Sequence, residues 1–274
     1  AQHTRLTDTA VGTIREPLLV RSADVVSALY LVDADAVQAL IDSPPGSERA
    51  AAPAVRVLRL PVSGQAVVLF SMLRYKSATL EPYIEIAIQV LAHLRGHEAR
   101  MRSALLKAAV MGLPEFVRRG FVSMDGLFAY VLALPVSTEQ SRLVGQGLYN
   151  SPKYRGDLSM QDSAGGLVVD DGAGVRIAVP SPPGLALPMM PFPPIGTNAP
   201  DGDGVLTCRI AVSARSRLRY STTGRLDITV APGATTTLSA VIRALGLSER
   251  RPSLLMQDDA FKVAFLPATQ LRAG

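Results

Sequence analysis

A lysine and a glutamate are the side chains in this sequence best suited to carbonyl chemistry. Lys153 follows Pro152 in a turn, and Glu85 lies in an alternating apolar and polar segment. A lysine amine attacks a ketone only when it is neutral, and the ordinary pKa of ~10.4 leaves few lysines neutral at pH 7. Burial in an apolar cavity lowers that pKa, and a nearby carboxylate can then carry protons during imine formation. By spacing alone, such a lysine is more often exposed on a turn and such a glutamate is more often solvated.

The segment around Glu85 has the two-residue period of a β-strand. Within Tyr83–Val90, Tyr83, Glu85, Ala87 and Gln89 face one way, and the isoleucine and valine residues at 84, 86, 88 and 90 face the other. An isoleucine and valine face is typical of a core. Glu85 therefore points to the opposite side, which is either a barrel interior or solvent.

The segment before Lys153 has a helical pattern. Ser137 and Gln140 have the spacing of a capping box, which predicts a helix that ends near Gly147. The chain then turns into Lys153.

The rest of the chain is rich in strand patterns with a few helices that do not alternate regularly with them, which predicts an α+β fold. We expect one domain over residues 1–274, with a helix in the segment 95–119. The seven prolines of Pro180–Pro194 predict a loop. Expected strands are Val25–Val32, Val55–Leu60, Gln65–Leu73, Phe128–Leu134, a hairpin over Gly166–Val179, Val205–Ser213, Leu226–Val230 and Ala260–Leu266, and further helices follow caps at Asp33 and Thr237.

Composition argues against several classes of function. The net charge is +5, but the basic residues are spread along the chain and aromatic residues make up only 5%, so we expect no nucleic-acid partner. No apolar run approaches the ~20 residues of a membrane-spanning helix, so we expect no membrane association. The amino terminus lacks a signal-peptide pattern and the single cysteine allows no internal disulfide, which favours a cytoplasmic location.

The motifs for metals and cofactors are incomplete. Three histidines and one cysteine, Cys208, supply too few ligands for a typical zinc site, and we expect no metal. Cys208 reads as a small core residue. Gly145-Gln146-Gly147 lacks the third glycine of a dinucleotide-binding loop, and we expect no cofactor.

Three segments, taken in order along the chain, resemble the acetoacetate decarboxylase-like superfamily. They are Tyr83-Ile84-Glu85, the helix ending Gly145-Gln146-Gly147-Leu148 with Ser151-Pro152-Lys153 after it, and Leu238–Leu247 with a strand that ends near Pro267. In the family, the lysine of a Pro-Lys pair forms the Schiff base. Acetoacetate decarboxylase itself is the known example of a lysine that is activated by desolvation or by a neighbouring cation.

The resemblance implies a curved, largely antiparallel sheet that closes into a barrel or cone around a pocket, in a homo-oligomer. It implies catalytic roles for Lys153 and Glu85. By colinearity, it also indicates substrate-binding positions at Arg21, Tyr83, Phe70 and Gln146.

The chain departs from the family where the substrate carboxylate would be handled. The family's arginine falls near Ala23, with Arg21 close by, and a second family carboxylate falls near Phe70. Gln146 stands where the family has arginine, and Tyr154 where the decarboxylase has a second lysine. The segment 95–119 resembles a helical insertion.

We therefore predict a Schiff-base-forming lyase that acts on a keto acid or related carbonyl compound, of decarboxylase or aldolase/dehydratase type. Family members in natural-product pathways suggest secondary metabolism as a setting. The alternative is a non-catalytic small-molecule-binding protein on the same fold.

Overall fold

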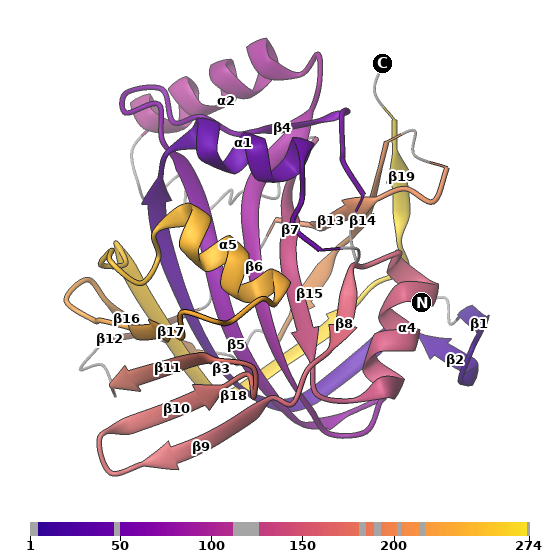
Figure 1. The fold of residues 1–274 in the computed structure, drawn as a ribbon. Coiled ribbons are helices and arrows are strands. Elements are labelled where there is room, and N and C mark those ends of the chain that lie inside the picture. Colours follow the sequence, from indigo (N-terminus) through magenta and orange to yellow (C-terminus); the bar gives the residue numbers. More distant parts are fainter. Residues whose placement is uncertain are drawn as a thin grey trace.

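The computed structural model describes residues 5–46, 50–111, 126–180, 185–188, 193–201, 204–213 and 217–272. The fold is α+β, as the sequence predicts. A large, mostly antiparallel sheet curls into a half-barrel, and a few helices lie against it (Figure 1).

The centre of the large sheet is formed by long strands in the order β18-β3-β5-β6-β7. They are rich in valine, leucine and isoleucine, which pack well on a pleated surface. Register shifts interrupt the ladders of β3 with both of its neighbours. Because such bulges bend a strand and increase its twist, they account for the curl. The strands are β3 (Leu18–Val32), β5 (Ala66–Ala78), β6 (Tyr83–Leu94), β7 (Leu127–Val136) and β18 (Leu254–Phe265).

Shorter strands extend or flank this centre, and two of them, β8 and β13, pair with β7 in parallel. They are β4 (Val55–Val57), β8 (Lys153–Arg155), β12 (Leu185–Pro188), β13 (Ile195–Asn198), β14 (Val205–Cys208), β15 (Ile210–Val212), β16 (Arg217–Ser221) and β19 (Thr269–Leu271).

Two smaller sheets accompany the large one. The hairpin expected over Gly166–Val179 is confirmed, and it belongs to a four-stranded sheet with the order β17-β11-β10-β9. The strands are β9 (Ser159–Ser163), β10 (Gly166–Asp170), β11 (Val175–Pro180) and β17 (Asp227–Val230), and the separate hairpin consists of β1 (Arg5–Thr9) and β2 (Gly12–Glu16).

The outer face of the large sheet carries the main hydrophobic core. Ile86 and Ile88 of β6 and Phe70 of β5 point to this face. Two helices cover it, α1 (Ala34–Asp42) and α5 (Thr237–Leu245), together with the four-stranded sheet. The isoleucine face of β6 is therefore a core face, as its alternation predicts.

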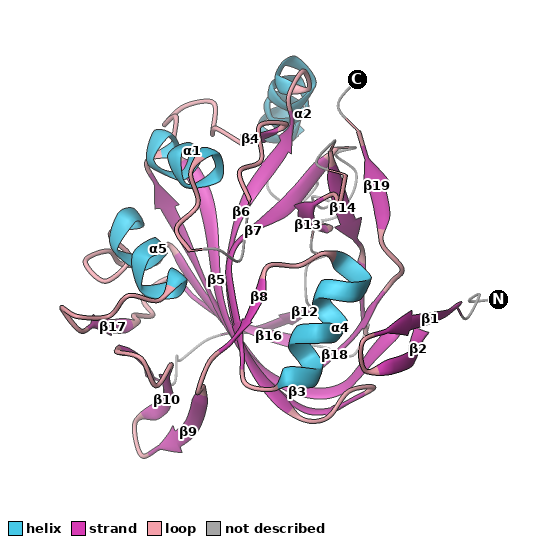
Figure 2. Cartoon of the chain, turned by 45° about the vertical axis from the view of Figure 1, so that its right-hand side comes forward, coloured by secondary structure: helices cyan, strands magenta, loops and turns pink. Residues whose placement is uncertain are grey.

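Helix α4 (Glu139–Tyr149) lies on the concave face. Figure 2 shows α4 on the opposite side of the sheet from α1 and α5. Val144 of α4 packs in a second cluster with Val25 and Leu73 of the sheet and with Tyr83. Tyr83, Glu85 and Gln89 of β6 point into the space between the sheet and α4.

The predicted helix in the segment 95–119 is confirmed over α2 (Glu98–Met111). Its Met101 and Leu105 pack on Leu91 and Leu127 near one end of the sheet. Residues 112–119 of the predicted segment lie outside the described residues.

The sequence patterns predicted the helices correctly, but they placed some helix ends one residue away from the observed caps. The cap at Asp33 is confirmed, but the caps at Ser137 and Thr237 are wrong by one residue, because Thr138 and Thr236 accept the capping hydrogen bonds. The Ser137 hydroxyl instead accepts the backbone N–H of Ile84 in β6, and the Gln140 side chain accepts that of Glu81, just before β6. The loop expected at Pro180–Pro194 contains strand β12, which pairs with β16.

Within the described part of the chain, no helix is long and apolar enough to cross a membrane.

Replacing Phe70 by alanine tests the two-faced sheet. Phe70 is fully buried on the outer face, so we expect Phe70→Ala to lower the free energy of unfolding by about 3–5 kcal/mol. Urea denaturation measures this loss. The control is Leu19→Ala, at a side chain that is 39% exposed, with an expected change within ~0.5 kcal/mol. Equal effects of the two substitutions would contradict the core position of Phe70.

Candidate active site

The carboxy-terminal end of α4 turns the chain toward the cavity. Asn150 adopts the left-handed conformation that favours asparagine after a helix, with φ of 44°, and its N–H donates to the Gln146 carbonyl. The Ser151 N–H donates to the Gly145 carbonyl at 3.2 Å. Lys153 then begins β8 and pairs with Leu134 of β7. These contacts fix the lysine backbone between the helix and the sheet.

Gly145 gives the Lys153 side chain room to cross α4. A Cβ atom at Gly145 would lie 2.5 Å from Lys153 Cδ and 2.8 Å from Ser151 Oγ, closer than real Cβ contacts allow. The glycine therefore shapes the path of the lysine stem.

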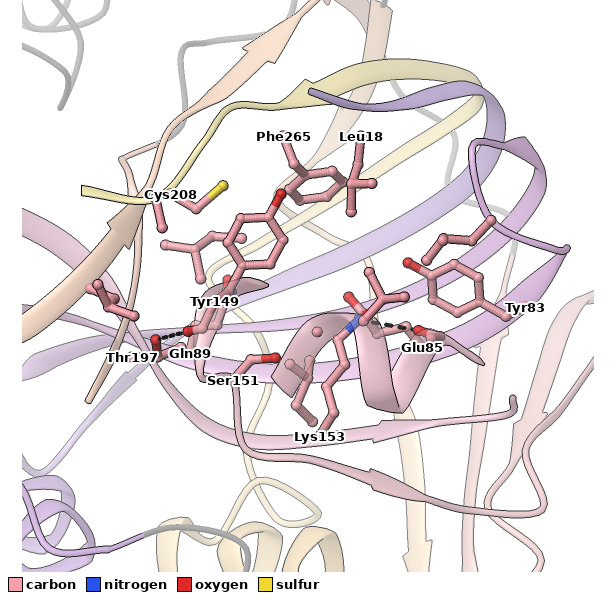
Figure 3. Close-up of a pocket in the computed structure, with 18 residues that line it drawn as sticks. Leu18, Tyr83, Glu85, Gln89, Tyr149, Ser151, Lys153, Thr197, Cys208 and Phe265 are labelled. Carbon is pink, nitrogen blue, oxygen red and sulfur yellow. Dashed lines mark hydrogen bonds and ion pairs between the residues drawn. The ribbon is translucent and has the colours of Figure 1, made fainter. Parts of the chain in front are cut away.

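The Lys153 ammonium meets Glu85 inside the half-barrel. Its Nζ lies 2.7 Å from Glu85 Oε2, and the two side chains are only 12% and 11% exposed. Nζ also donates to Ser141 Oγ at 3.2 Å and lies 5.3 Å from the centre of the Tyr83 ring. Figure 3 shows Lys153 extending to Glu85 beside Tyr83.

Two stacked tyrosines, one of which contacts Glu85, lie beside the ion pair. The Tyr75 hydroxyl donates to Glu85 Oε1 at 3.4 Å, and the Tyr75 ring stacks on Tyr83 with centroids 4.3 Å apart. Burial and the Glu85 charge raise the pKa of Tyr75 well above its usual value. Burial raises the pKa of Tyr83 to about 12, against the opposing effect of the Lys153 charge. Both phenols are therefore neutral at physiological pH.

Opposing effects set the pKa of Lys153. Burial is the largest influence and favours the neutral amine, but the charge of Glu85, the field of Tyr83 and the hydrogen bond to Glu85 together raise the pKa above its usual value. The resting pair is therefore an ammonium and a carboxylate.

The pair lies in the wall of a cavity of about 70 Å³, which can hold a molecule of a few heavy atoms. Ser151 contributes a buried hydroxyl that has no hydrogen-bond partner among the described residues. The Thr197 hydroxyl donates to the Tyr149 carbonyl. The described lining residues are Leu18, Leu80, Tyr83, Glu85, Gln89, Leu134, Ser141, Val144, Gly145, Tyr149, Ser151, Lys153, Ile195, Thr197, Leu206, Cys208, Phe265 and Ala268.

Of the six site residues predicted from the sequence, the structure brings Lys153, Glu85 and Tyr83 together. It does not bring the other three to this cavity. Arg21 lies in a bulge of β3, where the ladder with β5 passes from Val20 to Ser22, and its side chain is exposed. Phe70 points to the outer face, because it pairs with Ile88 of β6, on the face opposite Glu85.

Gln146 lies on the exposed side of α4. It contacts the backbone of Lys153 and not the cavity, since its side-chain amide donates to the Lys153 carbonyl at 2.9 Å.

The sequence analysis did not predict several of the lining residues. Strand and helix periodicity could have identified some of them. Gln89 shares a strand face with Glu85, and Ser141 is at helical spacing from Val144 and Gly145, which also line the cavity. Tyr149, Thr197 and Cys208 reach it only through long-range packing. Cys208 is buried as predicted, and its pKa is raised to about 12, chiefly by burial, so the thiol stays protonated.

In the described ranges, no group of three or more His, Cys, Asp or Glu side chains is arranged to hold a metal ion.

Comparison of folds identifies the architecture as that of the acetoacetate decarboxylases. One acetoacetate decarboxylase structure matches with a TM-score of 0.60 and 14% identity over 94% of this chain and 91% of the other. The enzyme from Legionella pneumophila matches with a TM-score of 0.59 and 12% identity over 93% and 87%. The enduracididine biosynthesis enzyme MppR, complexed with the condensation product of pyruvate and imidazole 4-carboxaldehyde, matches with a TM-score of 0.55 and 14% identity over 93% and 89%.

These likenesses confirm the predicted fold. No protein-family model matches the chain, and no curated protein is similar to it in sequence.

Substituting the two glycines of α4 by alanine separates an effect on the lysine from an effect on the helix. A Cβ at Gly147 would meet Thr9 at an ordinary 3.8 Å, so Gly147→Ala is expected to leave Lys153 in place and to stabilise the helix by up to ~1 kcal/mol. Gly145→Ala is expected to push the Lys153 stem aside and expose its amine. Peptide mapping after brief acylation measures this exposure. Equal protection of Lys153 in both variants would contradict the role of Gly145.

Proposed function

We propose that this protein is a lyase-type enzyme that forms a Schiff base between Lys153 and a carbonyl compound, with Glu85 as the proton shuttle. The observation that carries the proposal is the buried pair, with Lys153 Nζ 2.7 Å from Glu85 in the wall of a small cavity. A lone buried lysine would have no acceptor for its proton. Here the acceptor is in contact with the amine.

The proposed reaction begins with transfer of one proton from the Lys153 ammonium to Glu85. The neutral amine then attacks the carbonyl carbon and gives a carbinolamine. Glu85 returns its proton to the departing hydroxyl, which leaves as water, and the iminium ion remains. In total, ammonium and carbonyl compound become iminium ion and water.

The iminium ion draws electrons from the adjacent carbon. Loss of a proton, of carbon dioxide or of an aldol fragment from that carbon leaves the electron pair in an enamine. Glu85, at 2.7 Å from the nitrogen, is placed to remove or supply a proton there. Reprotonation and hydrolysis free the product and restore the amine.

The substrate class and the biological setting come from the fold relatives. Acetoacetate decarboxylases share the fold, and so does MppR, a biosynthesis enzyme seen in complex with pyruvate. A keto acid or related carbonyl compound and a biosynthetic role belong to the proposal for this reason.

Borohydride trapping tests the Schiff base directly. We expect reduction in the presence of a reactive carbonyl compound, from a panel of keto acids and simple ketones, to add the reduced carbon skeleton to Lys153. The chain has four lysines, so peptide mass mapping assigns the adduct without ambiguity. Lys153→Ala should abolish it, while Lys262→Ala, at an exposed lysine, should not. A folded protein that forms no adduct with any compound would instead favour a non-catalytic binding protein.

Replacing Glu85 by glutamine separates imine formation from proton transfer. In Glu85→Gln the charge that raises the Lys153 pKa is removed while burial remains, so more of the amine is neutral and the adduct still forms. Exchange of the ketone's α-protons for deuterium, followed by NMR, should fall by about 100- to 10,000-fold because the general base is lost. Glu81→Gln, at an exposed carboxylate, is the control. Unchanged exchange in Glu85→Gln would assign the base to another group.

A further inference from the structure

The charges of the side chains among the described lining residues of the cavity sum to zero. Among the described residues that line it, Lys153 and Glu85 are the charged ones, and each neutralises the other. Arg21, the sequence candidate for binding a substrate carboxylate, has an exposed side chain and is not part of the lining. The described lining therefore offers no cation that is not already paired.

We propose that the cavity accepts an uncharged, largely apolar ketone or aldehyde in preference to a keto acid anion. This inference rests on the Schiff-base function proposed above and narrows its substrate class.

Charge conservation along the reaction supports it. With a neutral substrate, the cavity holds an ammonium and a carboxylate before attack, and an iminium ion and a carboxylate after water leaves. The net charge is zero at both points. A substrate carboxylate would add an uncompensated negative charge within a largely apolar space, and burying an unpaired charge is costly.

The remaining lining fits a neutral molecule. Most of it is aliphatic or aromatic, and the cavity has a volume of about 70 Å³. The polar groups are neutral donors, among them the buried Ser151 hydroxyl, which has no partner among the described residues. Such a hydroxyl suits a carbonyl or hydroxyl oxygen of the substrate.

The inferred substrate also limits the bond that breaks. Without a carboxylate, the bond beside the iminium ion is a C–H bond, whose proton goes to Glu85, or a C–C bond to a carbon that bears a hydroxyl. In the second case the hydroxyl proton goes to Glu85, the fragment leaves as an aldehyde or ketone, and the electron pair enters the enamine. Enolisation and aldol cleavage or condensation are therefore the expected reaction types.

An isosteric pair of ketones tests the inference. Acetoacetate and 4-methylpentan-2-one have the same heavy-atom skeleton, with a carboxylate in one and an isopropyl group in the other. Borohydride trapping on Lys153 is measured against the concentration of each. We expect half-maximal trapping at a concentration at least about tenfold lower for the neutral ketone, a difference of ~1.4 kcal/mol.

The outcomes separate this inference from the proposed function. Equal or tighter trapping of acetoacetate on Lys153 would overturn the inference and leave the Schiff-base function intact. Failure of both compounds, and of the wider panel of carbonyl compounds, to label Lys153 would overturn both.

A charge placed in the lining supplies an independent check. Ala268 is half-buried in the cavity wall. Ala268→Arg should shift the ratio of half-maximal concentrations toward acetoacetate by about tenfold, and Ala268→Met, which adds length without charge, should not. The same ratio in both variants would show that charge does not set the preference.

Discussion

The ion pair between Lys153 and Glu85 is the constraint on which the rest of the site depends. Removing two charges from water is expensive, and a buried pair is tolerated only when its geometry is good and its remaining donors and acceptors are satisfied. Ser141, Tyr75 and Tyr83 supply those contacts. These residues come from α4, β5 and β6. The ion pair therefore depends on the curl of the sheet, on the placement of α4 and on the stacking of the two tyrosines together.

The curled sheet has two buried faces that differ in what they hold. Its outer face is a conventional core in which Phe70, Ile86 and Ile88 pack under α1 and α5. Its concave face holds a cavity under α4, and there the same strands present Glu85 and Gln89. Strand alternation lets one strand stabilise the fold with one set of residues and line the cavity with the other. The outer face therefore holds the larger hydrophobic core, and the inner face holds smaller apolar clusters, the cavity and the ion pair.

Sequence patterns predicted what depends on local periodicity. The alternation of β6 placed Glu85 opposite an apolar face, and the helix before Lys153 and the hairpin at Gly166–Val179 followed from turn and capping residues. The choice between a barrel interior and solvent for Glu85 needed the curl of the whole sheet. Arg21 was misplaced because a bulge in β3 redirects its side chain, and a bulge depends on the register with a distant strand. Gln146 contacts the lysine backbone because of how α4 packs, which its own sequence does not show.

At rest, Lys153 is an ammonium, but the proposed reaction needs a neutral amine. Burial of the pair explains how the amine could lose its proton. Burial is the largest single influence on Lys153 and favours the neutral amine, and the Glu85 charge outweighs it only together with smaller contributions. Passing the proton to Glu85 turns two ions into two neutral groups, and the relative energy of the neutral pair falls as water leaves the site. In the proposed reaction, an apolar ketone that fills the cavity would exclude water from the pair, so its binding would favour the neutral amine that attacks it. A carboxylate ligand would bring its own charge and hydration into the cavity and would lose this advantage. In the proposed reaction, the apolar lining and the ion pair therefore favour the same class of substrate.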